Sequence, residues 1–215
     1  MLILFDCDGV LVDSEIIGNR VLAALLSANG YPITAAQSRA RFLGRTIPGV
    51  IDMVGEVGVR LPDDFEDQLR LRDEAAFSAE LQPVPGVTEV LERLPGPRAV
   101  ASSGALTKIE RNLEITGLRR FFGRHLFSAE MVRHPKPAPD LFHYAMRAMG
   151  HDATETVVIE DSPLGVEGAK RAGMRVLGFH GASHCTSTTA DTLRSAGADA
   201  VFDKMADLPR LLGLG

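Results

Sequence analysis

The sequence predicts an α/β fold in which helices cover both faces of a parallel sheet and an all-helical segment interrupts the chain after the first strand. Three observations lead to this prediction. Apolar residues run without a break from Met1 to Phe5 and stop at Asp6, which is typical of a strand buried on both faces. From residue 83 onward, short apolar runs alternate with helical patterns. Between these two regions the periodicity is helical throughout.

The helical segment is expected to contain four helices. Asp13 and Ser14 give an N-cap signal for the first of them, which ends before Gly30. Glycines and a proline then separate three more helical patterns, at Thr34–Leu43, Pro48–Val57 and Pro62–Ala79. The predicted domains are a core of residues 1–13 and 82–215 and a helical domain of residues 14–81.

The rest of the core is expected to alternate strands and helices. The predicted strands are Ala99–Ser102, His125–Ser128, Thr156–Ile159, Met174–Phe179 and Ala200–Phe202. The predicted helices are 87–94, Thr107–Ile115, a helix after Pro139, and Pro163–Ala172. Thr107 and Glu110 have the spacing of a capping box. Ser162 is a candidate N-cap for the helix that begins at Pro163.

Composition excludes several classes of protein. The 215 residues suffice for one core with an insertion, and 45% apolar and 24% charged residues are ordinary for a globular protein. A net charge of −5 gives no basic footprint for nucleic acid, and no apolar stretch is long enough to span a membrane. Cys7 and Cys185 do not form a disulfide framework. We therefore expect a cytoplasmic monomer with no nucleic-acid or membrane partner.

Polar residues follow several of the predicted strands, where ligands bind in open α/β sheets. Asp6 and Asp8 come directly after the first strand, and Gly9 allows a sharp turn there. An isolated Asp-x-Asp pattern more often ends a strand than forms a site. Three further segments with polar residues near strand ends favour a functional site instead.

Each of the three segments has an ordinary explanation when taken alone. Ser102-Ser103-Gly104 offers small donors and backbone amides suited to phosphate oxygens, but also a simple strand end. Lys136 lies between two prolines, and alone it would be interpreted as a surface charge. Glu160-Asp161 follows a strand and precedes a helix that it might only cap. Their common position at one sheet edge favours a site instead. Crowded carboxylates need a cation, and a set of hard oxygen ligands favours Mg²⁺.

These segments resemble the four motifs of the haloacid dehalogenase superfamily. The matching stretches are Asp6-Cys-Asp-Gly-Val-Leu-Val-Asp-Ser-Glu, Ser102, Lys136-Pro-Ala-Pro and Ile159-Glu-Asp-Ser-Pro-Leu-Gly-Val-Glu-Gly-Ala-Lys-Arg-Ala-Gly. The resemblance is to the branch that contains sugar phosphatases and β-phosphoglucomutases. It implies a Rossmann-like core with a small helical cap domain inserted after the first strand.

The resemblance also implies a role for each residue. Asp6 attacks phosphorus to form an aspartyl-phosphate, and Asp8 is the general acid and base. Lys136 neutralises charge between the phosphate and the nucleophile. The Mg²⁺ ligands are expected to be Asp6, the backbone carbonyl of Asp8, Glu160 and Asp161. The phosphate-binding residues are expected to be Gly9, Ser102, Ser103, Gly104 and Lys136.

The same resemblance leaves three activities open. Asp8 argues against a true dehalogenase, because halide departure needs no acid. The mutases of the family carry a cap histidine that residues 16–19 lack, which favours a phosphatase. We expect hydrolysis of a small phosphorylated metabolite, a sugar phosphate or sugar-acid phosphate, with Arg45 of the Gly44-Arg45-Thr46 loop as a candidate substrate contact. A phosphosugar mutase and a non-catalytic binding protein are the alternatives.

His180, His184 and Cys185 form a second polar cluster, after the fifth strand. A structural zinc site usually has four ligands in recognisable pairs, and this cluster has only three. It is interpreted as an ordinary loop.

Overall fold

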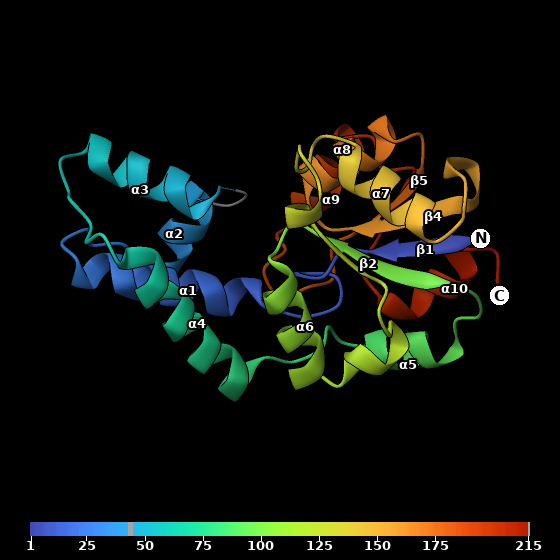
Figure 1. Cartoon of the computed structure of the whole chain (residues 1–215), viewed down its shortest axis with the longest axis horizontal. Coiled ribbons are helices and arrows are strands. Elements are labelled where there is room, and N and C mark those ends of the chain that lie inside the picture. Colours follow the sequence, from blue (N-terminus) through green and yellow to red (C-terminus); the bar gives the residue numbers. More distant parts are fainter. Residues whose placement is uncertain (43–44, 215) are drawn as a thin grey trace. The chain divides into compact units, whose positions relative to one another are not determined.

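A computed structural model describes residues 1–42 and 45–214 of the chain. The chain divides into two compact units (Figure 1). The core unit comprises Met1–Asp13 and Gln82–Gly215, and the helical unit comprises Ser14–Leu81.

The described part of the core unit contains a six-stranded sheet with the strand order β3-β2-β1-β4-β5-β6. Every neighbouring pair is parallel, which confirms the predicted α/β class. The strands are β1 (Leu2–Phe5), β2 (Arg98–Ser102), β3 (Leu126–Ser128), β4 (Thr156–Glu160), β5 (Arg175–Phe179) and β6 (Ala200–Phe202). Because β1 lies between β2 and β4, the first residues after it reach the middle of the sheet edge.

Helices cover both faces of this sheet (Figure 1). They are α5 (Val87–Arg93), α6 (Leu106–Ile115), α7 (Asp140–Ala148), α8 (Pro163–Arg171), α9 (Thr189–Ser195) and α10 (Leu208–Leu211). Leu2 and Leu4 face α7, α8 and α9 and pack in one apolar cluster with Phe142 and Val166. Phe5 faces the opposite side, where it packs edge to face with Phe122. The centroids of the two rings lie 5.9 Å apart. Alternation along a strand thus supplies both layers of the core.

Two helix starts in the core unit test the capping predictions. Ser162 Oγ accepts a hydrogen bond from Gly165 N at 3.1 Å, which confirms Ser162 as the N-cap of α8. The capping box at Thr107 is wrong, because α6 already begins at Leu106. The Leu106 amide instead donates to Glu130 Oε2 at 2.9 Å, from the short 3₁₀ helix Ala129–Met131.

The helical unit contains α1 (Glu15–Ala28), α2 (Ala35–Phe42), α3 (Ile47–Glu56) and α4 (Phe65–Glu80). Its apolar cluster includes Leu25, Leu26, Phe42, Val50 and Phe65. Leu43, the predicted last residue of the second helix, and Gly44 lie outside the described residues. Ser14 occupies the N-cap position of α1, which confirms the predicted start of this helix, although its side chain makes no capping hydrogen bond to the backbone.

The remaining general predictions concern membranes and disulfides. No helix within residues 1–42 or 45–214 is long and apolar enough to cross a membrane. Cys7 is buried, Cys185 is partly exposed, and both are free thiols.

Candidate active site

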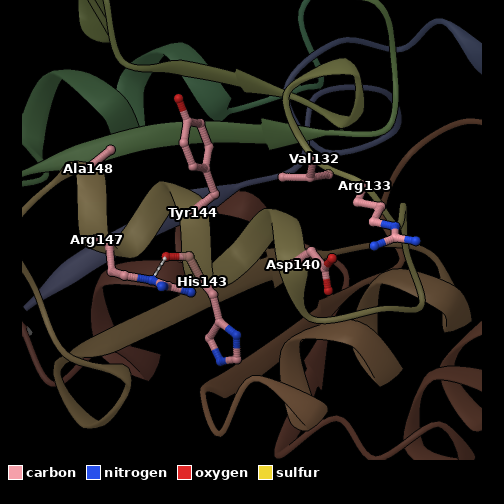
Figure 2. A pocket seen from close by; sticks show the side chains of 7 residues that line it. All are labelled: Val132, Arg133, Asp140, His143, Tyr144, Arg147 and Ala148. Atoms are coloured by element: carbon pink, nitrogen blue, oxygen red, sulfur yellow. Dashed lines mark hydrogen bonds between the residues drawn. The ribbon is translucent and has the colours of Figure 1, made fainter.

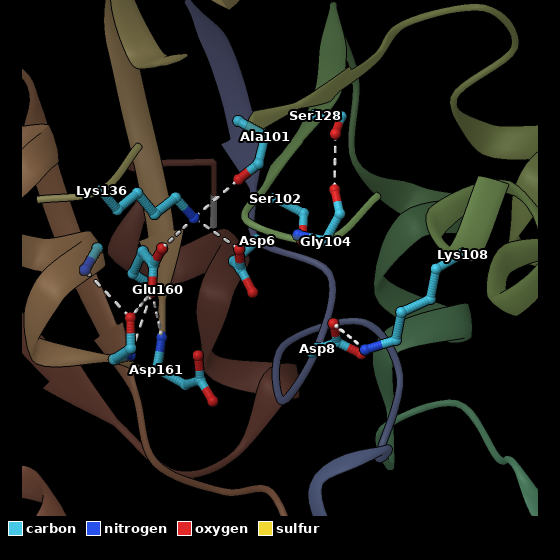
Figure 3. Close-up of polar contacts among 12 residues, drawn as sticks. Asp6, Asp8, Ala101, Ser102, Gly104, Lys108, Ser128, Lys136, Glu160 and Asp161 are labelled. Atoms are coloured by element: carbon cyan, nitrogen blue, oxygen red, sulfur yellow. Dashed lines mark hydrogen bonds and ion pairs between the residues drawn. The ribbon is translucent and has the colours of Figure 1, made fainter. Parts of the chain in front are cut away.

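The strand ends of β1, β2 and β4 bring most of the predicted core-site residues to one edge of the sheet (Figure 3). Asp6 directly follows β1, and its amide still donates to Ile159 O of β4 at 2.9 Å. Ser102 and Glu160 are the last residues of β2 and β4. The parallel register of three adjacent strands therefore brings Asp6, Ser102 and Glu160 to the same edge of the sheet.

Lys136 lies between two of the acids. Its Nζ donates to Asp6 Oδ1 at 2.6 Å, to Glu160 Oε1 at 2.5 Å and to Ala101 O at 2.9 Å, which uses all three ammonium hydrogens. Its side chain is only 4% exposed. Burial by itself lowers the pKa of Lys136, but the two adjacent carboxylates outweigh burial and raise it above its ordinary value. Lys136 is therefore a permanent buried cation.

Asp6, Glu160 and Asp161 are all buried, and each has a potential ligand oxygen within 4.8 Å of those of the other two. Burial raises the pKa of Asp6 well above its usual range; Lys136 opposes this rise, and the charges of Glu160 and Asp161 add to it. Three carboxylates lie together here, and the single positive charge of Lys136 cannot neutralise all of them. A cation held by carboxylate oxygens would remove this excess, so the donor set fits a hard metal ion.

Glu160 is held firmly by local geometry. Its Oε2 accepts hydrogen bonds from Asp161 N and Ser162 N at 3.1 Å and from Ser162 Oγ at 2.9 Å. A methyl group added at Gly165 would lie 1.8 Å from Glu160 Oε1, so a residue larger than glycine cannot occupy position 165 without displacing this carboxylate. The start of α8 therefore sets the orientation of Glu160.

Gly9 leaves room for Asp161. Gly9 has φ +79°, and a methyl group added there would lie 1.9 Å from Asp161 Oδ2. We expect Gly9→Ala to lower turnover by about 100-fold, because a misplaced catalytic group costs about this much. Gly150→Ala is the matched control, since Gly150 also has positive φ (+71°) but nothing within 4 Å of the added methyl group. Both variants carry the backbone penalty of about 1–2 kcal/mol. Equal turnover in the two variants would show that the space at Gly9 is not needed.

Asp8 is oriented toward a different partner. Its Oδ2 accepts a hydrogen bond from Lys108 Nζ at 3.0 Å, and Figure 3 shows this pair apart from the Lys136 cluster. A methyl group added at Gly104 would lie 3.7 Å from Ser102 Oγ and 3.8 Å from Asp8 Oδ2, so Asp8 borders the loop that follows β2. Sequence reasoning missed Lys108. The available signal was its position in the first turn of a helix that directly follows that loop.

The loop after β2 has a fixed shape. Ser102 is buried, and its Oγ accepts from Gly104 N at 3.3 Å, whereas Ser103 is exposed. Ser128 Oγ, at the end of β3, donates to Gly104 O at 2.7 Å and so ties the loop to the next strand. The phosphate-binding role of this loop stays a prediction.

His184 also reaches the acids, although the sequence interpretation left it out of the site. Its Nε2 lies 3.2 Å from Asp161 Oδ2, and the residue is 9% exposed. Burial by itself lowers the pKa of His184, but the hydrogen bond with Asp161 and the nearby charges raise it to about 10. The available signal was its place after β5, the strand beside β4.

Arg45 belongs to the helical unit. It is exposed, and its backbone amide donates to Phe42 O at 2.9 Å. Its neighbour Gly44 lies outside the described residues, and the role of Arg45 as a substrate contact stays a prediction.

A hollow on the core unit lies beside α7 (Figure 2). The residues that line it are Val132, Arg133, Asp140, His143, Tyr144, Arg147 and Ala148. Asp140 Oδ1 lies 3.0 Å from His134 Nδ1, so this carboxylate already has a hydrogen-bond partner. The hollow shares no lining residue with the acidic cluster and is not part of the candidate site.

A buried lysine and three acids at the strand ends of a parallel sheet are the arrangement implied by the family resemblance. A family model described as haloacid dehalogenase-like hydrolase matches residues 1–173. The chain belongs to the haloacid dehalogenase-like hydrolases.

A named phosphatase and two solved structures of the family resemble the chain over most of its length. The chain is 30% identical over 179 residues to 6-phosphogluconate phosphatase of Escherichia coli, covering 82% of this chain and 81% of the relative. A haloacid dehalogenase-like protein of unknown function from Agrobacterium tumefaciens has a TM-score of 0.88 at 38% identity, with 99% and 97% of the two chains covered. A family hydrolase from Deinococcus radiodurans, solved with phosphate and sodium, has a TM-score of 0.83 at 30% identity, with 99% and 94% covered. These findings support the predicted class of enzyme, a phosphatase.

Proposed function

We propose that the protein is a Mg²⁺-dependent phosphatase that hydrolyses a small phosphorylated metabolite through an aspartyl-phosphate on Asp6. The observation that carries this proposal is the contact of one buried lysine, Lys136, with both Asp6 and Glu160 beside a third acid. Such a site offers a nucleophile, a fixed positive charge and a place for a cation within a few ångströms. Phosphoryl transfer depends chiefly on positioning and charge stabilisation of this kind.

The proposed cation ligands are Asp6, Glu160, Asp161 and the backbone carbonyl of Asp8. Carboxylate and carbonyl oxygens are the donors that Mg²⁺ prefers, and no softer donor belongs to the acidic cluster of the described residues. A bound Mg²⁺ would supply positive charge for the phosphoryl oxygens. The excess negative charge around Asp6 supports this assignment.

In the proposed first step, a carboxylate oxygen of Asp6 forms a bond to phosphorus. The bond between phosphorus and the substrate oxygen breaks, and the leaving oxygen takes a proton from Asp8. Lys136 holds Asp6 Oδ1 in place and offsets the charge that gathers between the nucleophile and the phosphate. Backbone amides of the loop after β2 and the Ser102 hydroxyl would hold the phosphoryl oxygens.

In the proposed second step, water attacks the phosphorus of the aspartyl-phosphate. Asp8, now deprotonated, accepts the proton of this water, and the bond between Asp6 and phosphorus breaks. Inorganic phosphate leaves, and Asp6 returns to its carboxylate form. Asp8 thus regains the proton that it needs for the next turnover.

The proposed substrate class is a sugar phosphate or sugar-acid phosphate. The similarity to a protein named 6-phosphogluconate phosphatase supports this class. Lys108 adds a positive charge beside Asp8, and its side chain is 36% exposed, which suits an acidic substrate. We further propose that the helical unit is the cap domain and contributes Arg45 to substrate recognition. The two free thiols agree with a cytoplasmic protein.

The test measures phosphate release from sugar phosphates, sugar-acid phosphates and a generic aryl phosphate, with Mg²⁺ and with EDTA. We expect selective release from one class, and a loss of more than about 100-fold in EDTA that added Mg²⁺ reverses, because one dication supplies several kcal/mol of charge stabilisation. Turnover unchanged by EDTA would contradict the metal assignment. Conversion of a sugar 1-phosphate to its 6-phosphate without phosphate release would instead identify a mutase.

A further inference from the structure

The loop after β5 brings His184 against the acidic cluster. Its Nε2 faces Asp161 Oδ2 at 3.2 Å and Cys185 Sγ at 3.6 Å. Its Nδ1 is buried and has no hydrogen-bond partner among the described residues. The ring therefore places one nitrogen against Asp161 and leaves the other buried without a hydrogen bond to any residue that the structure describes. With a proton on Nε2, His184 can donate a hydrogen bond to Asp161 whether the ring is neutral or positively charged.

Several contacts fix this loop in the core unit. Ser183 Oγ donates to Asp13 Oδ1 at 2.7 Å, and Ser183 N donates to the same oxygen at 3.3 Å. A methyl group added at Gly181 would lie 1.9 Å from Asp203 O, so the loop packs closely against the end of β6. His184 is therefore presented by an anchored segment, and its side chain loses little further entropy when it holds a carboxylate.

The same ring closes one side of the space around Asp161. A methyl group at Gly9 would meet Asp161 Oδ2 at 1.9 Å and His184 Cε1 at 2.9 Å. The turn at Gly9, the Asp161 carboxylate and the imidazole of His184 thus border one another closely. Glu160, by contrast, is oriented by three donors at the start of α8. Within the described residues, His184 is the side chain that donates a hydrogen bond to Asp161.

We propose that His184 is a positioning residue of the cation site, which holds Asp161 in the orientation that Mg²⁺ requires. This inference rests on the proposed function, because it assumes that Asp161 is a cation ligand. Groups that hydrogen-bond to a ligand fix its direction, and their loss typically weakens metal affinity by about 10- to 100-fold. A zinc site at this loop is a weaker interpretation, because His180, His184 and Cys185 do not converge as a group of potential ligands in the described part of the chain.

The test measures the Mg²⁺ dissociation constant by isothermal titration calorimetry and turnover as a function of Mg²⁺ concentration. His184→Leu removes the donor at similar volume, and His184→Gln keeps an N–H donor. His180→Leu, a half-buried histidine of the same loop, is the matched control. We expect His184→Leu to weaken Mg²⁺ binding by about 10- to 100-fold, His184→Gln to recover most of it, and His180→Leu to stay within about twofold of the wild type. Turnover of His184→Leu should return toward the wild-type value at saturating Mg²⁺.

Three outcomes would overturn the proposal. A His184→Leu protein with wild-type Mg²⁺ affinity would show that Asp161 needs no support. Equal losses in the Leu and Gln variants would show that the ring only fills space. If His184→Leu does not fold, His184→Asn replaces it, because the shorter amide cannot span the same distance; equal affinity of Asn and Gln variants would then contradict the proposal. A wild-type protein that binds no Mg²⁺ would instead refute the proposed function, and the inference with it.

Discussion

Asp6→Asn is expected to lower phosphate release by more than about a thousandfold, because the amide cannot act as the nucleophile that the mechanism needs. The fold should survive. Asn has nearly the same size as Asp, and Lys136 keeps its bonds to Glu160 and Ala101 O. The buried cluster also loses one of its three carboxyl groups, the one whose pKa is raised by burial and by the two neighbouring acids. In Mg²⁺-free buffer, the melting temperature of the variant should therefore equal or exceed that of the wild type.

Asp203→Asn is the matched control for this experiment. Asp203 also follows a strand, β6, but its side chain is exposed and it is not part of the acidic cluster. Turnover of this variant should stay within about twofold of the wild type, as expected for a surface substitution. Phosphate release by Asp6→Asn at the level of Asp203→Asn would exclude Asp6 as the nucleophile. An Asp6→Asn protein that melts well below the wild type would contradict the charge argument.

The strands were predictable because each apolar run is bounded by polar residues. The ends of β1, β2 and β4 differ by at most one residue from the prediction, and the polar groups of the site lie on the last residue of a strand (Ser102, Glu160) or on the residue after it (Asp6, Asp161). Two short helices escaped prediction. α9 carries only two apolar residues, Ala190 and Leu193, and α10 has only four residues, so neither shows a clear apolar periodicity.

What the sequence could not show are contacts between distant segments. At the start of α6, the backbone amide of Leu106 donates a hydrogen bond to Glu130, 24 residues away, and a local capping box is not used. Lys108 meets Asp8 across 100 residues of chain. His184 meets Asp161 only because β4 and β5 are neighbours. Motif residues at strand ends could be placed on one edge from topology alone, whereas the groups that orient them depend on packing that no local pattern encodes.

Lys136→Met is expected to produce the largest loss of stability. Met keeps the length of the side chain but leaves two buried carboxylates, those of Asp6 and Glu160, without their cation. Removing one partner of a buried ion pair typically costs about 3–5 kcal/mol of unfolding free energy. Turnover should fall by more than about a hundredfold, because the charge between nucleophile and phosphate is lost.

Lys170→Met is the matched control for Lys136→Met, because it removes a lysine whose ion pair is exposed to solvent. Lys170 pairs with Asp199 at 2.8 Å, but both side chains are more than one-third exposed, and such a pair contributes only about 0–1 kcal/mol. Urea unfolding of both variants in EDTA and in Mg²⁺ provides the comparison. We expect the deficit of Lys136→Met to be large in EDTA and smaller in Mg²⁺, because a cation on the same carboxylates partly replaces the ammonium group. Equal unfolding free energies for the two variants in EDTA would show that the acids do not depend on Lys136. A deficit that Mg²⁺ leaves unchanged would show that no cation binds beside Asp6 and Glu160.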